Sequence, residues 1–189
     1  MGVSTPDILG KVLAHRVKHT VADNNLTPAA VLLLLYPKDG EYCILLNKRS
    51  QQVEHHRGEV SFPGGAWDPQ DRDYQDTALR ETEEEMGING ADVTVLGQLD
   101  DVVTQSRFAV RVYMGTIPYP YAFKPSAVEI AEVLEVPIST LRDPASLRLE
   151  TRWVDGAYTT TCSYAYDGHL IFGATAKILQ QFLELLEVG

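Results

Sequence analysis

The sequence has little cysteine and no long apolar run. Its only cysteines, Cys43 and Cys162, lie far apart and without the spacing of metal ligands, so we expect two reduced thiols and no disulfide. No uninterrupted apolar segment reaches the roughly 18 residues of a transmembrane helix, and no signal peptide is visible. These features predict a cytoplasmic protein that does not enter a membrane.

Basic residues are also scarce relative to acidic ones. Lys and Arg number 16 against 26 Asp and Glu, which gives a formal net charge of −10. This surplus repels polyanions, and it argues against nucleic acid or an anionic membrane surface as the partner. A small anionic substrate remains compatible with it, because a bound metal and a local basic patch outweigh the global field at a site.

The length is that of one domain with a sizeable core. We therefore expect a single domain over residues 1–189, in which residues 1–28 form an N-terminal helical extension. Within the extension, Pro6 follows a capping Thr5 and apolar residues recur at near-helical spacing, which predicts an amphipathic helix over residues 5–21.

The most informative stretch is residues 64–88, where a diglycine turn and an acidic loop precede a helix. Asp73 is a suitable N-cap and Gly87 supplies a left-handed stop, so we place the helix at residues 74–86. One stripe of this helix is expected to face the core, namely Leu79, Thr82 and Met86.

The helix carries four glutamates within five residues. At about 100° per residue, Glu81, Glu84 and Glu85 share an arc of about 100° on one face. Like charges at this spacing repel, and a divalent metal reverses the sign of that interaction. Hard oxygen ligands suit Mg²⁺ or Mn²⁺, which bridge to substrate phosphates. Taken alone, the acidic run has the alternative reading of a solvated helix face.

The same stretch resembles the Nudix box, G-x(5)-E-x(7)-R-E-U-x-E-E-x-G-U. Two departures exist: Asp71 stands where the box has its first Glu, with one extra residue before Arg80, and Thr82 replaces an apolar residue. The insertion lies in the loop, so it affects only the role of Asp71. The matching positions are Gly65, Arg80, Glu81, Glu84, Glu85, Gly87 and Ile88.

The segment before the diglycine brings Lys48, Arg49 and Arg57 towards a flexible glycine turn, where charged donors and open amides suit phosphate oxygens. It is similar to the motif of coenzyme A pyrophosphatases, a Nudix subgroup. The matching positions are Leu45, Leu46, Arg49, Ser50, Gly58, Phe62, Pro63, Gly64 and Gly65.

Two residues depart from that motif. Asn47 replaces a Thr, and Glu54 replaces an Arg and so reverses a charge. Either Arg57 or Lys48 takes over the phosphate contact, or the chain prefers another nucleotide such as ADP-ribose or a dinucleotide. His56 would suit a further substrate contact.

The order of elements predicts an α/β/α sandwich with a mixed sheet, which is also the fold that the resemblance implies. An apolar strand at residues 29–36 should be central in the sheet and form a hairpin with residues 41–47. The remaining expected elements are strands at 93–96, 108–117, 153–155, 158–166 and 169–172 and a final helix at 174–187.

The resemblance implies a metal-dependent hydrolase of a nucleotide diphosphate, with coenzyme A or an acyl derivative as substrate. Glu81, Glu84 and Glu85 and the Gly64 carbonyl would hold the metal, and Arg80 would orient a carboxylate. The general base would be a helix glutamate or Glu129, with Glu132 as second choice. A binding module without catalysis is the alternative from another class, and a homodimer remains open.

Overall fold

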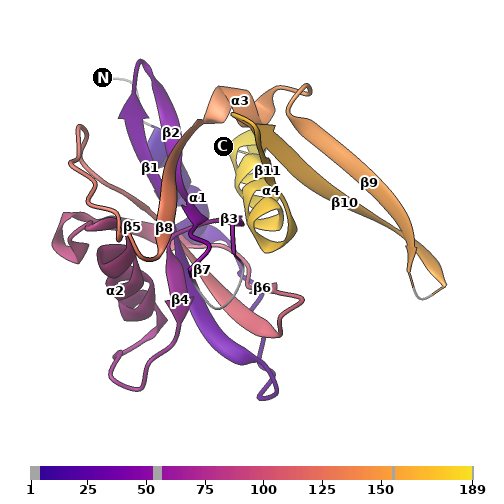
Figure 1. The fold of residues 1–189 in the computed structure, drawn as a ribbon, viewed down its shortest axis with the longest axis horizontal. Coiled ribbons are helices and arrows are strands. Elements are labelled where there is room, and N and C mark those ends of the chain that lie inside the picture. The colour runs from indigo at the N-terminus through magenta and orange to yellow at the C-terminus, as the bar shows by residue number, and fades with distance from the viewer. Residues whose placement is uncertain (1–4, 53–56, 155, 189) are drawn as a thin grey trace.

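The computed structural model describes residues 5–52, 57–154 and 156–188, and it has three layers (Figure 1). A mixed sheet lies between helix α2 (Tyr74–Met86) on one face and helices α1 (Thr5–His15) and α4 (Gly173–Val188) on the other. A short helix, α3 (Ile138–Arg142), and a 3₁₀ turn at Gly90–Asp92 complete the helical elements of the described ranges. The predicted α/β/α sandwich is confirmed.

The main sheet has eight strands, and β1 pairs with β7 in parallel while the other pairings are antiparallel. A separate three-stranded sheet has the order β11-β10-β9. The strands are β1 Thr27–Lys38, β2 Glu41–Arg49, β3 Val60–Ser61, β4 Gly64–Ala66, β5 Thr94–Gln98, β6 Val102–Val103, β7 Phe108–Thr116, β8 Ile130–Pro137, β9 Leu147–Val154, β10 Ala157–Tyr166 and β11 His169–Ile171.

Strand β1 is paired on both edges, as its apolar sequence predicts. Because side chains alternate along a strand, its leucines divide between two cores. Leu33 and Leu35 belong to the core beneath α1 and α4, whereas Leu32 and Leu34 belong to the core beneath α2. The central strand thereby joins both helical layers.

β1 and β2 pair only near their hairpin and then separate. Residues 35–38 pair with residues 41–44, and further along β2 pairs with β3 while β1 pairs with β4. The segment at residues 60–66 thus crosses the gap between the two strands, and the Leu32 amide donates to the Pro63 carbonyl at 2.9 Å. The diglycine that we expected to be a flexible turn is instead a short paired strand, because this gap offers its backbone partners.

The N-terminal helix is shorter than predicted. It ends at His15, because the following segment finds better partners on the β5–β6 connection. Arg16 Nη2 lies 2.6 Å from Asp100 Oδ2, and the Val21 amide donates to Asp101 Oδ2 at 2.6 Å. Strand β9 is longer than expected, since it runs over Leu147–Val154 and not only residues 153–155.

Within the described ranges, no helix is long and apolar enough to cross a bilayer. Cys43 and Cys162 are both free thiols, with Cys43 buried and Cys162 partly exposed.

We predict that Gly64→Ala destabilises the fold by about 2–4 kcal/mol, the sum of backbone strain and overpacking. Gly64 has φ +150, and a Cβ there would lie 2.3 Å from the Ala30 carbonyl oxygen and 2.6 Å from the Val31 Cα. Gly40→Ala is the matched control, because Gly40 has φ +88 but nothing within 4 Å of the added Cβ. Urea unfolding should show a clearly larger loss for Gly64→Ala, and equal losses would contradict the close approach.

Candidate active site

Helix α2 spans Tyr74–Met86 as predicted, and both of its ends are capped. The Asp73 side chain accepts from the Asp76 amide at 2.9 Å, and Gly87 has φ 66 while its amide donates to the Glu83 carbonyl. These caps fix where the helix begins and ends, and therefore which residues it turns towards the sheet.

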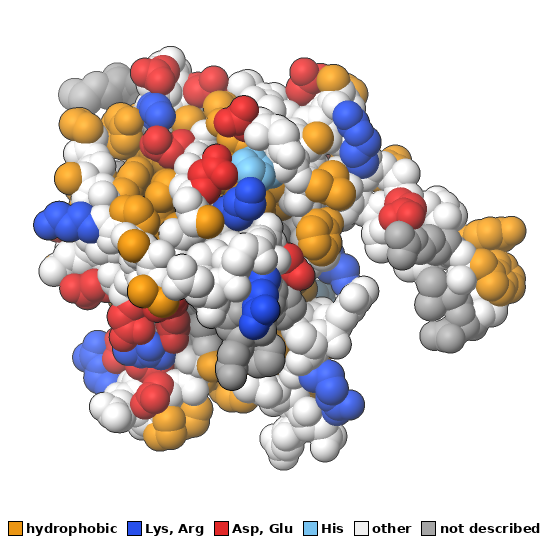
Figure 2. All heavy atoms as spheres, viewed as in Figure 1, with side chains coloured by type: hydrophobic (Ala, Val, Ile, Leu, Met, Phe, Trp, Pro, Cys, Tyr) orange, Lys and Arg blue, Asp and Glu red, His pale blue; other side chains and the backbone are white. Residues whose placement is uncertain are grey.

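The three acidic residues that we expected to share one face differ in burial. Glu85 is 1% exposed and lies on the buried face with Thr82 and Met86. The side chains of Glu81 and Glu84 are 18% and 57% exposed. Figure 2 shows acidic and basic side chains gathered together over α2. The exposure of the carboxylates on this helix therefore rises from the buried Glu85 through Glu81 to the solvent-exposed Glu84.

Arg80 connects the acidic loop to the helix. Its Nε and Nη2 donate to the two oxygens of Asp71 at 2.8 and 3.0 Å, and its Nη1 donates to Glu81 at 2.8 Å and Glu84 at 3.3 Å. The Thr77 hydroxyl also donates to Asp71 at 2.8 Å. These bonds, those from Arg80 above all, hold the pKa of the buried Asp71 carboxyl well below its usual range. Asp71, in spite of its shifted position, is thus the partner that orients Arg80.

Glu85 accepts three hydrogen bonds from the two strands β2 and β4, beside the gap between β1 and β2. Its Oε1 accepts from Arg49 Nη1 at 3.0 Å, and its Oε2 accepts from Asn47 Nδ2 at 3.0 Å and from the Gly64 amide at 3.2 Å. Burial nevertheless raises the pKa of Glu85 to about 7. The buried Asn47 is itself fixed, because its Oδ1 accepts from the Ser61 hydroxyl at 2.9 Å.

Glu81 faces the backbone of β4 at close range. A Cβ on Gly65 would lie 2.4 Å from the Glu81 carboxylate, so a larger residue at this position would displace that carboxylate from β4. Burial is the main cause that raises the pKa of Glu81, and the charges of Glu84 and Glu129 contribute in the same direction. Glu129 therefore lies within electrostatic reach of the site.

Glu132, the second choice for a distal carboxylate, is engaged elsewhere. It lies 3.2 Å from Nε2 of His169 on β11 and 3.9 Å from Lys48 Nζ. His169 was not singled out from the sequence, because nothing local signals that β11 reaches β8.

The chemistry of this donor set suits a small divalent cation. Two carboxylates are largely buried with raised pKa values, and both adjoin the backbone of β4, so a cation would offset the cost of their charges. As the side chains stand, no three Asp, Glu, His or Cys within residues 5–52, 57–154 and 156–188 form a group that could hold a metal ion. Arg80 instead pairs with Glu81 and Glu84, and Arg49 pairs with Glu85.

The loop after β2 is tied to the segment that carries Glu129. The Ser50 amide donates to the Glu129 carbonyl at 2.7 Å, and the buried Ser50 hydroxyl donates to the Val128 carbonyl. Gly58 closes the loop, with its amide donating to the Arg49 carbonyl at 3.1 Å. Ser50 and Gly58 therefore shape this loop, whereas its positive charge comes from Arg57 and from Lys48 and Arg49 at the adjoining end of β2. Glu54 and His56 lie outside the described residues.

Phe62, expected to contact substrate, has another role. It is 2% exposed and belongs to the core beneath α1 and α4, which leaves it no surface for a ligand. Its place in the sequence motif, between β3 and β4 along the chain, reflects packing in that core.

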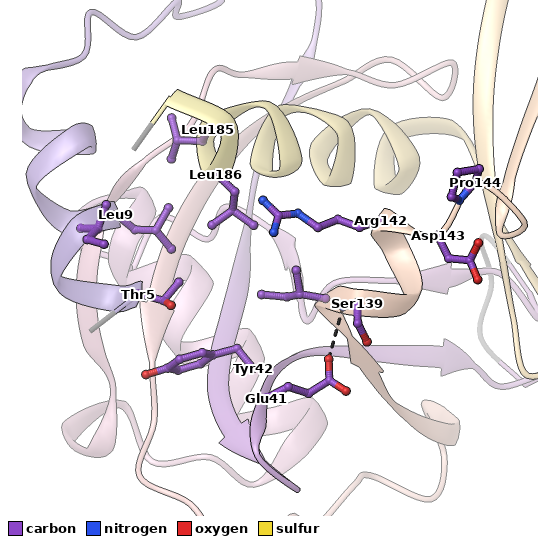
Figure 3. A pocket seen from close by; sticks show the side chains of 12 residues that line it. Thr5, Leu9, Glu41, Tyr42, Ser139, Arg142, Asp143, Pro144, Leu185 and Leu186 are labelled. Atoms are coloured by element: carbon purple, nitrogen blue, oxygen red, sulfur yellow. Dashed lines mark hydrogen bonds between the residues drawn. The ribbon is translucent and has the colours of Figure 1, made fainter. Parts of the chain in front are cut away.

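A hollow of about 830 Å³ lies away from these residues, between α1, α3, α4 and β2 (Figure 3). Its lining is mostly apolar, and Ile8, Leu9 and Leu186 contribute to it. It contains none of the predicted site residues. The chemistry described above is therefore on the α2 side, and this hollow is not part of it.

Replacing Asp71 by Asn should lower the free energy of unfolding by about 1.5–3 kcal/mol at neutral pH, because hydrogen bonds to charged groups are lost. Since the folded pKa of Asp71 is depressed, this stabilisation is present above the unfolded pKa of about 3.9 and is lost as the pH falls towards the folded value. Urea unfolding of both proteins from about pH 7 to about pH 3 should therefore show a shrinking difference. Arg72→Gln, which breaks an exposed pair with Asp76, should have a much smaller effect. A pH-independent difference for Asp71→Asn would contradict the assignment.

Asn47→Leu should lower the free energy of unfolding by about 1–3 kcal/mol, because it deprives the buried Glu85 and the half-buried Ser61 of a partner. A double-mutant cycle with Glu85→Gln, measured by urea unfolding, should give a coupling of about 0.5–3 kcal/mol between the two positions. Additive losses would show that the amide does not support the carboxylate.

Comparison with known proteins places this geometry in a family. The model of the NUDIX domain matches residues 26–146. An uncharacterized Nudix hydrolase NudL of Photorhabdus laumondii is 34% identical over 169 residues, which is 89% of each chain. The protein of the same name from Pectobacterium atrosepticum is 42% identical over 141 residues, covering 73% of this chain and 72% of that one.

Solved structures agree on the fold. A Nudix hydrolase from M. smegmatis, RenU, has a TM-score of 0.58 at 20% identity and covers 86% of both chains. The NUDIX domain of Shewanella oneidensis NrtR, solved with ADP ribose, has a TM-score of 0.53 at 16% identity and covers 92% of this chain and 91% of that one. The chain belongs to the Nudix hydrolase family.

Proposed function

We propose that the protein hydrolyses a diphosphate linkage in a nucleoside diphosphate derivative with the help of Mg²⁺ or Mn²⁺. The observation that carries this proposal is the pair of largely buried carboxylates, Glu81 and Glu85, set against the glycine backbone of β4 and beside the guanidinium of Arg49. Negative and positive groups are thus arranged within one site, which suits a substrate whose anionic oxygens must be neutralised before attack.

Glu81, Glu84 and Glu85 with the Gly64 carbonyl are the proposed metal ligands. A bound cation would neutralise phosphate oxygens and lower the pKa of a coordinated water. For the acids to reach it, Glu81 and Glu84 would exchange Arg80 for the cation, and Glu85 would exchange Arg49. Asp71 would keep Arg80 in place during that exchange, because it holds two other nitrogens of the guanidinium.

The remaining residues bind the substrate and move the proton. Arg49, once released by Glu85, would donate to phosphate oxygens together with Lys48 and Arg57. Glu129 or one of the helix glutamates would accept the proton of the attacking water. The contribution of Glu129 to the raised pKa of Glu81 supports its nearness to that water.

Coenzyme A or an acyl derivative is the proposed substrate, cut into phosphopantetheine and adenosine 3′,5′-bisphosphate. The support is the sequence motif around Arg49, Ser50 and Gly58, with His56 as a further contact outside the described residues. ADP-ribose or a dinucleotide is the second candidate, because Glu54 reverses the charge of a motif position. A non-catalytic nucleotide-binding module is the third.

We also propose that residues 1–189 act as one domain in the cytoplasm, on a small molecule and not on nucleic acid or a membrane. Packing of Leu9 and Leu13 in the main core supports inclusion of the N-terminal extension. The net charge of −10 supports a small-molecule substrate.

Activity should be highest on coenzyme A or acetyl-CoA when these are compared with ADP-ribose, NADH and diadenosine polyphosphates in Mg²⁺ and in Mn²⁺. A chelator should abolish it, and Glu85→Gln should lower kcat/KM about 100-fold or more, because metal stabilisation of the transition state is worth several kcal/mol. Glu83→Gln, an exposed neighbour on the same helix, is the matched control and should retain activity. The readout is the phosphate that phosphatase treatment releases beyond the amount released from uncleaved substrate, because coenzyme A already carries a 3′-phosphate.

Preference for ADP-ribose or a dinucleotide would retain the hydrolase proposal and overturn the coenzyme A proposal. Metal binding without turnover of any compound would favour the binding module.

A further inference from the structure

Strands β9 and β10 form a two-stranded arm that extends away from the rest of the molecule (Figure 1). Their antiparallel register places four pairs of residues on one face of the arm. From base to tip the pairs are Leu147 with Tyr164, Leu149 with Cys162, Thr151 with Thr160 and Trp153 with Tyr158. This face is apolar or uncharged along its whole length.

Only the base of that face is covered. Tyr164 is buried, Leu147 packs against the main core, and Cys162 Sγ donates to Gln180 of α4. Towards the tip, Leu149, Trp153 and Tyr158 are 67%, 63% and 77% exposed. The apolar face of the arm thus begins in the core under α4 and continues into solvent.

The two tip aromatics pack on one another. The rings of Trp153 and Tyr158 are 4.8 Å apart and meet edge to face at 74°. Large aromatic side chains that remain exposed on an extended ribbon are typical of a protein interface.

The outer edge of β9 is unpaired among the described residues, because the sheet order is β11-β10-β9. This edge spans eight residues without proline, so it presents a row of backbone donors and acceptors. A strand of this kind pairs readily with another strand.

The sequence of β9 is complementary to itself. In an antiparallel pair of two copies centred on Thr151, Leu149 of one copy would face Trp153 of the other. In the same register, position 150 of one copy would lie opposite position 152 of the other, and the sequence places residues of opposite charge at these two positions. Self-complementarity about one residue is what a twofold axis requires, and an unrelated partner would not need it.

We propose that β9 pairs with β9 of a second copy of this chain about a twofold axis at Thr151. The two arms then form one continuous sheet, and the exposed Leu149, Trp153 and Tyr158 of each copy share one apolar face. Pairing about a twofold axis uses both free edges at once, so the assembly closes as a dimer and does not grow into a fibre.

The test is the mass of the full-length protein by sedimentation velocity from about 1 to 100 μM, a range that brackets a micromolar Kd. Wild type should shift from monomer towards dimer as its concentration rises. Thr151→Lys should remain monomeric, because the twofold axis would place two lysines opposite each other. Thr159→Lys makes the same change at an exposed position of β10 on the other face of the arm and should dimerise like wild type. Circular dichroism and a thermal melt check that each variant folds.

A second measurement gives a positive signal for the same register. Thr151→Cys should form a covalent dimer under mild oxidation, seen on a non-reducing gel, because the axis brings the two thiols together. Thr159→Cys is its control. The proposal is overturned if wild type is monomeric throughout the range, if both lysine variants dimerise equally, or if monomeric wild type sediments with phosphatidylcholine vesicles through Trp153. None of these results depends on hydrolase activity.

Discussion

The burial of one carboxylate, that of Glu85, is the constraint on which the site depends. A charged group with so little exposure is costly unless it is hydrogen-bonded. Here the donors come from β2 and β4, which lie on opposite sides of a gap in the sheet. Glu85 therefore connects three features of the fold. It extends from α2 towards the gap where β1 separates from β2, and it contacts the segment at residues 60–66 that crosses this gap.

Two arginines divide the negative charge of α2 between them. Arg80 is held by Asp71 in the loop before the helix and reaches the outer acids, whereas Arg49 at the end of β2 reaches the inner one. Together the two guanidinium groups offset the repulsion between these acids along the helix. The same arrangement leaves the positive charge of Arg49 next to the loop proposed to bind phosphate, so this residue would serve both folding and the proposed substrate binding.

The two helical layers on either side of the sheet differ in the features that they carry. The α2 layer carries the charged site, while the layer of α1 and α4 carries the larger core, the apolar hollow and the base of the β9–β10 arm. Because β1 contributes alternate leucines to both layers, the core beneath the site and the core at the base of the arm share this central strand. The arm nevertheless lies on the layer away from α2, so an interface there would leave the site open to substrate.

Sequence by itself determined what depends on neighbours along the chain. The caps of α2, the β1–β2 hairpin and the central place of β1 follow from Asp73, Gly87 and an unbroken apolar run, and each was predictable because turns, caps and side-chain periodicity are local. The acids of α2 were likewise identifiable as a group.

Tertiary structure decided which partner each side chain meets. Spacing on a helix could not distinguish the buried Glu85 from the exposed Glu84. The two residues lie on the same arc of the helix, but only Glu85 reaches the gap between β1 and β2. The paired state of the diglycine, the burial of Phe62 and the early end of α1 at His15 also arise from strands and loops distant in sequence. Hydrogen-bond partners and burial are set by which distant segments come together, and no local pattern of residues contains that information.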